Sequence, residues 1–291
     1  MFKNVKILCL SMIFLSILSL LGQSNSNTII SLETRQRMHA APGNSSFEII
    51  TKKIKWETSH TAIIICDMWD QHWCRGASKR VAELAPIVNR FVSIARHQGV
   101  LIVHAPSGVV DYYENQQARQ NALLVPKAQN TPSYIGSWCE SLEGEPKESW
   151  PIDQSDGGCD CQPQCQQGHP WTRQIDSIEI FDDDIISDDG IEIWAVFEDH
   201  DINNVILVGV HTNMCVIGRP FGLRNMVRAG KNVVLCRDLT DTMYNSRKAP
   251  FVSHFEGTDL VIAYIESFIC PTMVSTAITD EPPFKFSKNR R

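Results

Sequence analysis

Three uninterrupted runs of mostly apolar residues constrain the fold of this chain most. They are Thr61–Cys66, Val100–Val103 and Val205–Val210. A strand with two apolar faces must be covered on both sides, as it is inside a parallel sheet. Segments with helical spacing of apolar residues lie between these runs, and Val81–His97, followed by Gly99, is the clearest. The alternation predicts an α/β fold with three layers, in which helices cover both faces of a mostly parallel sheet.

Weaker patterns complete this predicted domain, which we expect to span residues 47–275. Further helices are expected over residues 113–124, 190–200, 216–229 and 259–268, and further strands over 177–180 and 232–236. Residues 27–46 are polar and are interpreted as a flexible arm, and residues 276–291 as a polar tail.

The first 26 residues resemble a targeting segment. Lys3 and Lys6 precede the apolar run Ile7–Leu21, and small and polar residues follow it. This order predicts a signal peptide over residues 1–26 and export to the periplasm or the cell exterior. The run is short for a membrane-spanning helix, which needs about 20 apolar residues. We therefore expect no stable membrane span after cleavage, and an uncleaved anchor is the alternative.

Charge and motifs exclude some partners. The formal net charge is −6, and nucleic-acid binding needs a surplus of Lys and Arg. The sequence also lacks a phosphate-binding P-loop signature. We expect a small-molecule substrate, no nucleic acid, and a homo-oligomer as an option.

Residues 126–175 form a long insertion with little apolar periodicity. It contains Cys139, Cys159, Cys161 and Cys165. In an exported protein, these cysteines favour disulfides. Their spacing, continued by His169, also resembles a set of zinc ligands, and zinc remains the second option.

The carboxyl ends of parallel strands are where ligands bind in open α/β sheets. Cys215 follows the strand at 205–210 and precedes a predicted helix. The positive end of a helix favours a thiolate, and the free backbone N–H groups of Met214 and Cys215 can receive an oxyanion. Cys215 is therefore the candidate nucleophile, and an inert buried cysteine is the alternative.

Asp67 ends the strand at 61–66 on the same edge of the sheet. A carboxylate at that position can accept the thiol proton and return it to a leaving group. A helix-capping role is the alternative. The catalytic interpretation of Asp67 is favoured because Cys215 is expected at the same edge of the sheet.

Two segments resemble the signature motifs of the isochorismatase-like cysteine hydrolases. They are Ile65-Cys66-Asp67-Met68-Trp69-Asp70 and Val208-Gly209-Val210-His211-Thr212-Asn213-Met214-Cys215-Val216. The resemblance, over about residues 55–270, implies a parallel sheet of about six strands and an Asp–Lys–Cys triad acting through an acyl-enzyme. It also implies a cis peptide bond, which by position is Val210–His211. A cysteine at position 215 favours the amide-hydrolysing branch of the family.

The sequence departs from the family at the lysine of the triad. Phe181–Ser187, where that lysine is expected, contains none. A cation is still needed, because neighbouring anions in a dry pocket raise each other's pKa. We favour Arg173 as the third catalytic residue, with Lys127, Arg219 or a metal as alternatives.

The substrate-binding candidates lie on or near the same rim. Arg219 and Arg224 can clamp a substrate carboxylate, or they can pair with structural acids such as Asp238 or Asp241. The other candidates are His211, Trp69 and His104. The Asp-x-His metal motif of nicotinamidase-type members is absent after His104, so no metal and no other cofactor are predicted.

These features predict a cysteine-dependent hydrolase of a C–N (amide-type) bond in a small substrate, with an anionic group as one option. The main alternative is a non-catalytic small-molecule-binding protein on the same fold, which the missing lysine supports. A redox role ranks last because no Cys-x-x-Cys motif accompanies Cys215.

Overall fold

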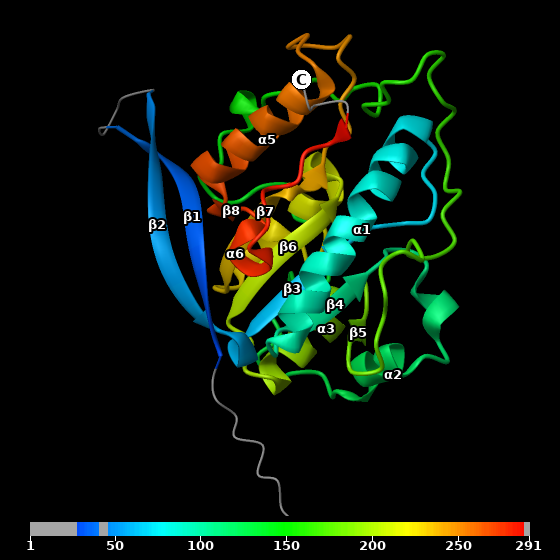
Figure 1. Cartoon of the computed structure of the whole chain (residues 1–291), viewed down its shortest axis with the longest axis vertical. Coiled ribbons are helices and arrows are strands. Elements are labelled where there is room, and N and C mark those ends of the chain that lie inside the picture. Colours follow the sequence, from blue (N-terminus) through cyan, green and yellow to red (C-terminus); the bar gives the residue numbers. More distant parts are fainter. Residues whose placement is uncertain (1–27, 41–45, 288–291) are drawn as a thin grey trace, which may run out of the picture.

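The computed structural model describes residues 28–40 and 46–287. The predicted signal peptide lies outside the described residues. The chain forms one sheet of eight strands in the order β2-β1-β8-β7-β6-β3-β4-β5 (Figure 1). The strands are β1 (Ile29–His39), β2 (Phe47–Glu57), β3 (Thr61–Cys66), β4 (Leu101–Ala105), β5 (Ile185–Ile186), β6 (Asn204–Val210), β7 (Asn232–Asp241) and β8 (Thr272–Met273).

The central strands are parallel, as their continuous apolar sequences require. β3 pairs in parallel with β4 and with β6, and β6 with β7. Side chains of β3 alternate between two cores: Ile64 packs into one cluster, whereas Ile63 and Ile65 pack into the other. Both faces of the strand are therefore buried.

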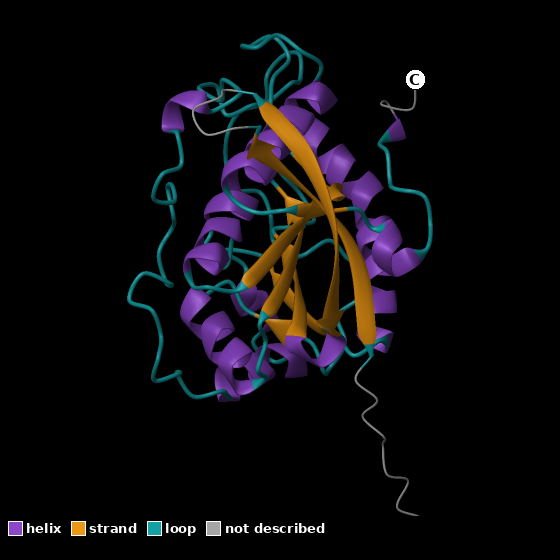
Figure 2. Cartoon of the chain, turned by 90° about the vertical axis from the view of Figure 1, so that its left-hand side faces the viewer, coloured by secondary structure: helices purple, strands orange, loops and turns teal. Residues whose placement is uncertain are grey.

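Helices cover the two faces of the sheet, which is seen between them in Figure 2. They are α1 (Arg75–His97), α2 (Gln117–Leu124), α3 (Gly190–Asp199), α4 (Leu223–Arg228), α5 (His254–Phe268) and α6 (Thr276–Thr279). Apolar residues of α3, α4 and α5 belong to one core cluster, and those of α1 and α6 to the other. The predicted three-layer α/β/α fold is confirmed. Among the described residues, no helix has the length and hydropathy of a membrane span.

The edges of the sheet differ from the prediction. β1 and β2 form an antiparallel hairpin, and β1 also pairs antiparallel with β8, so the sheet has eight strands rather than about six. The expected flexible arm therefore contains β1, whose Ile30 and Leu32 are buried in the core. Residues 177–180 form no strand, and the strand at this edge is the short β5. In the expected polar tail, Phe286 is buried.

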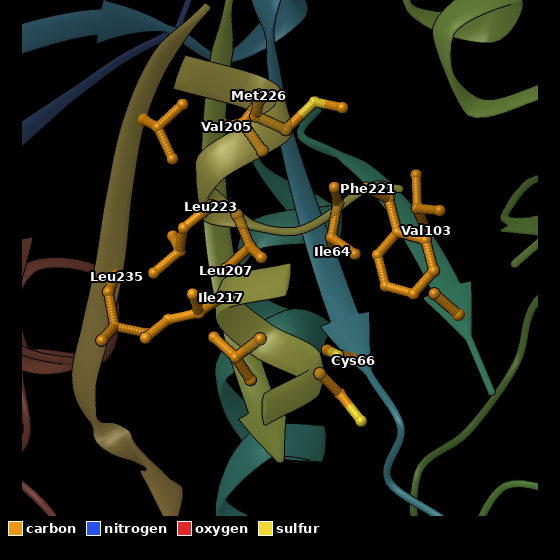
Figure 3. Close-up of a cluster of buried hydrophobic side chains, with 14 of the residues drawn as sticks. Ile64, Cys66, Val103, Val205, Leu207, Ile217, Phe221, Leu223, Met226 and Leu235 are labelled. Atoms are coloured by element: carbon orange, nitrogen blue, oxygen red, sulfur yellow. The ribbon is translucent and has the colours of Figure 1, made fainter. Parts of the chain in front are cut away.

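The segment after β6 is not the single helix expected over residues 216–229. Thr212–Val216 forms a π-helical turn, and α4 begins only at Leu223. Between them, Ile217 and Phe221 pack into the core beside Ile64 and Leu207 of the sheet (Figure 3). These apolar anchors hold the turn against the carboxyl ends of the strands.

The described part of the insertion contains a 3-10 turn at Lys147–Ser149 and an isolated β-bridge between Gln174 and Trp69. All cysteines in the described part of the chain are free thiols. The disulfides expected within the insertion are therefore not seen.

Candidate active site

Asp67 is held immediately after β3. Its backbone adopts a left-handed conformation, with φ of 48°, and its side chain is fully buried. Aspartate is one of the few residues other than glycine that tolerate this conformation. One carboxylate oxygen accepts a hydrogen bond of 2.7 Å from the backbone N–H of Ser107. The turn and this bond fix the carboxylate at the edge of the sheet.

Cys215 lies in the π-helical turn, after a cis peptide bond between Val210 and His211. The Cys215 side chain is hydrogen-bonded to Asp67, and its sulfur accepts a bond from the His211 backbone N–H. The two residues with the strongest catalytic prediction thus meet in the structure, at the carboxyl ends of neighbouring strands.

Arg219 provides the cation beside this pair. Its Nε lies 3.2 Å from Oδ2 of Asp67. The Arg219 N–H donates to the Cys215 carbonyl at 3.0 Å, so the arginine lies one helical turn after the cysteine.

Arg173, which we expected in this role, is directed elsewhere. Its guanidinium pairs with Asp176 at 2.8 Å and lies 3.6 Å from Asp70. Lys127 is exposed in the insertion. The expectation for Arg173 is corrected: sequence proximity to the position of the family lysine did not place its side chain at Asp67, and Arg219 contacts that carboxylate instead.

Burial controls the protonation of the cluster. It raises the pKa of Cys215, and the Asp67 carboxylate raises it further, whereas Arg219 opposes both. Burial also raises the pKa of Asp67, against the lowering effects of Arg219 and of the hydrogen bond with Cys215. Burial lowers the pKa of Arg219, but Asp67 and Cys215 outweigh it and leave that pKa above its ordinary value. We therefore assign a thiol and a guanidinium, and the guanidinium and the hydrogen bond from Cys215 favour the ionised form of Asp67.

Cys215 opens onto a cavity of about 540 Å³. The insertion supplies much of its wall, and the other lining residues follow β6 or lie on α4 and α5. The lining residues are Trp138, Glu140, Glu145, Trp150, Gln154, Asn213, Met214, Cys215, Arg219, Arg224 and Tyr264. A cavity with aromatic walls and a few polar groups suits a small organic molecule.

Arg224 lines the cavity but is already paired. Its guanidinium donates to both carboxylate oxygens of Glu145, at 2.9 and 2.5 Å, and the Tyr264 hydroxyl donates to the same carboxylate at 3.1 Å. Arg219 is likewise paired, with Asp67. The partners are thus Glu145 and Asp67 rather than Asp238 or Asp241.

The remaining substrate-binding candidates do not line this cavity. His211 is buried with its ring edge against His72, and burial lowers its pKa well below the ordinary value. Trp69 stacks on Trp171, with ring centroids 4.5 Å apart. His104 is fully buried and bonded to Gln174 and Asp184. Their positions are those of structural residues.

One of the two predicted oxyanion donors is already used. The backbone N–H of Met214 donates to the His211 carbonyl at 3.0 Å. The Cys215 amide belongs to the π-helical turn at the cavity and stays a prediction.

Sequence reasoning missed most of the cavity wall. Trp138, Trp150 and Gln154 lie in an insertion without periodicity, and no motif identified them. The position of Arg219 beside Cys215 could have been predicted from the sequence. Residues four apart on a helical turn share a face, and Arg219 follows Cys215 by four.

When the chain is compared with known proteins, the matches are to solved structures. No protein-family model and no curated protein matches the sequence. A cysteine hydrolase from Pseudomonas syringae pv. phaseolicola 1448A is 15% identical, with a TM-score of 0.47, covering 77% of this chain and 93% of that one. An isochorismatase family protein from Desulfovibrio vulgaris subsp. vulgaris str. Hildenborough is 13% identical, with a TM-score of 0.42, covering 76% and 97%.

An N-carbamoylsarcosine amidase from Thermoplasma acidophilum is 10% identical, with a TM-score of 0.39, covering 74% of this chain and 96% of that one.

Proposed function

We propose that the protein is a cysteine hydrolase that cleaves the C–N bond of a small amide through a thioester. One observation carries the proposal: the Cys215 thiol faces a cavity while it is hydrogen-bonded to a buried aspartate that is paired with an arginine. A nucleophile, a base and a fixed cation within bonding reach are what acyl transfer requires.

Because the pKa of the Cys215 thiol is raised, the thiol keeps its proton until it attacks, and the proton is transferred during the attack. Sulfur attacks the amide carbonyl as its proton moves to Asp67, and the negative charge passes to the carbonyl oxygen. Protonated Asp67 then gives the proton to the leaving nitrogen, and the tetrahedral intermediate collapses to a thioester. Water, deprotonated by Asp67, attacks the thioester and releases the carboxylic acid and the thiol. Arg219 holds Asp67 in place and balances its charge.

The cavity supports a neutral substrate rather than an anionic one. Both of its arginines are paired with buried carboxylates, and Glu140 is exposed at the cavity. The rings of Trp138, Trp150 and Tyr264 offer flat apolar contacts. We therefore propose a small aromatic or apolar primary amide. The N-terminal segment supports an exported location for this activity.

The test is ammonia release from a panel of neutral primary amides and their carboxylate-bearing analogues. We expect turnover of neutral members, and a thioester on the peptide containing Cys215 in acid-quenched samples by mass spectrometry. Cys215→Ala should abolish both signals, and Cys270→Ala, which removes a buried thiol outside the cavity, should preserve them. Ligand binding without turnover in any member would favour the non-catalytic alternative.

A further inference from the structure

A cluster of cysteines lies apart from the cavity lining. Cys74 immediately precedes α1, and Cys159, Cys161 and Cys165 belong to the insertion. The sulfur atoms of Cys74, Cys159 and Cys161 all lie within 4.8 Å of one another. The Cys165 sulfur contacts those of Cys159 and Cys161. Three thiols from two distant segments thus lie together, and Cys165 lies beside two of them.

The separation of the Cys74 and Cys161 sulfurs matches that of two ligands on one metal ion. The Cys74 and Cys161 sulfurs are 3.9 Å apart. Four sulfurs around a zinc ion, at Zn–S distances of about 2.3 Å, are separated by about 3.8 Å. A disulfide needs about 2.05 Å. An iron–sulfur cluster distributes its four thiolates over two or four iron atoms and therefore spreads the set more widely than one metal ion does.

Backbone amides surround the sulfurs as they would surround thiolates. The first N–H groups of α1 point at the cluster: Arg75 donates to Cys165 at 3.5 Å and Gly76 to Cys161 at 3.2 Å. The Cys161 and Cys165 amides donate to the Cys159 sulfur. The positive end of a long helix favours negative charge at its first turn, and N–H bonds to ligand sulfurs stabilise bound thiolates.

Gly76 permits one of these approaches. A Cβ at this position would lie 2.6 Å from a carboxylate oxygen of Asp160 and 3.4 Å from the Cys161 sulfur. Arg247 adds positive charge close by, because its guanidinium donates to the carbonyl oxygens of Asp160 and Cys161. The positive charge of Arg247 suits an anionic group at the cluster.

We propose that Cys74, Cys159, Cys161 and Cys165 bind one zinc ion as a structural site. Each thiol loses its proton to solvent when the metal binds, so four protons leave, no atom changes oxidation state, and the site carries a charge of −2. Four protein ligands close the coordination sphere, so this zinc has no open position for substrate. It joins the insertion to the start of α1, and the insertion carries Trp138, Trp150 and Gln154 of the cavity wall.

The test measures metal directly. The full chain, produced with zinc in the medium and purified without chelators, should contain one zinc per chain by elemental mass spectrometry. The reduced protein, stripped and reloaded with Co²⁺, should show the intense visible bands and thiolate charge transfer of tetrahedral sulfur coordination. Cys74→Ser and Cys161→Ser should lose or weaken the metal. Cys139→Ser should retain it, because the Cys139 thiol contacts the Ser141 carbonyl instead.

Several outcomes would overturn the proposal. One is wild-type protein that holds no zinc and takes up no cobalt after reduction. Another is non-reduced peptide mapping that finds the same four cysteines in disulfides. A third is full zinc content in the Cys74→Ser variant. If the serine variants do not fold, the cobalt spectrum of the wild-type chain still tests the proposal, because the spectrum shows whether the ligand atoms are sulfur.

Discussion

Asp67 and Arg219 act on Cys215 with opposite signs. The carboxylate raises the pKa of the Cys215 thiol, and the guanidinium lowers it. Arg219 also favours the ionised form of Asp67, because it lowers the carboxyl pKa that burial raises. The balance keeps the resting thiol protonated while a base waits within hydrogen-bonding distance. Alkylation of the resting thiol is therefore expected to be slow near neutral pH, and slow labelling alone is no evidence against catalysis.

Asp67→Asn separates thiol reactivity from turnover. Removing the negative charge should lower the pKa of Cys215 and speed its alkylation by iodoacetamide at neutral pH. Hydrolysis should fall by about 10²–10⁴, because no group then carries the proton to the leaving nitrogen. Labelling rates against pH, read on the Cys215 peptide, and amide turnover measure the two effects. A labelling midpoint that rises in this variant would contradict the assigned charges.

Arg219→Met should shift the pKa of Cys215 in the opposite direction to Asp67→Asn. Without the guanidinium, the pKa values of both Cys215 and Asp67 should rise. Alkylation should slow, and the pH at which hydrolysis begins should move upward. Arg173→Met removes a charge that pairs with Asp176 instead and should leave both measurements near wild type. A large activity loss in Arg173→Met with normal Arg219→Met would restore the original expectation.

At the scale of elements, β6 must come close to β3 where the site begins. Gly209 has a φ of 104°, and a Cβ there would lie 2.1 Å from the Cys66 carbonyl oxygen. The register of β6 against β7 shifts between Leu207 and Gly209. This register shift changes the direction of the chain just before the turn that contains Cys215.

Gly209→Ala should therefore destabilise the protein more than a glycine change at an open position. Gly144 also has positive φ, of 78°, but a Cβ there meets nothing within 4 Å. Its change to alanine should cost about 1–2 kcal/mol, and Gly209→Ala about 1–3 kcal/mol beyond that. Urea unfolding of both variants measures the difference. Equal losses of unfolding free energy in the two variants would mean that the close approach of Gly209 to Cys66 does not affect stability.

The central elements could be predicted because burial on both faces leaves a strong mark in a sequence, as at β3 and β6. The hairpin was missed because β1 is polar in composition and buries only alternate residues such as Ile30 and Leu32. Asp67 and Cys215 were predicted from strand ends and motifs. Arg219 was named as a substrate ligand and as one alternative to Arg173 beside Asp67, but it was not the favoured one, because the direction of a side chain after a π-helical turn is set by tertiary packing.

At the scale of the molecule, neutral buried histidines make stability depend on pH. Burial lowers the pKa of His72 to about 4, and burial also lowers that of His211. In the unfolded chain, histidine binds a proton near pH 6.5. The unfolded state therefore takes up more protons as pH falls from about 6.5 to about 4, and stability falls with it.

His72→Gln should flatten this loss between pH 6.5 and 4, by about 1–3 kcal/mol. His97→Gln, a change at an exposed histidine in the last turn of α1, is the control and should keep the wild-type slope. Chemical unfolding at several pH values measures both. An unchanged slope in His72→Gln would place the acid sensitivity elsewhere. Below about pH 4, loss of the Asp241 pairs with Arg80 and His254 adds a further decrease.

The insertion supplies walls of the cavity, whereas Asp67, Cys215 and Arg219 come from β3 and from the turn after β6. Part of the cavity wall and the residues of the proposed chemistry are thus encoded in separate stretches of the gene. Under the proposed function, changes at Trp150 are expected to alter which amide fits, whereas Trp138 also faces the Arg219 guanidinium, 5.8 Å from its ring centroid. If the proposed activity holds, a library confined to the insertion, with its cysteines left intact, is the direct route to new substrates.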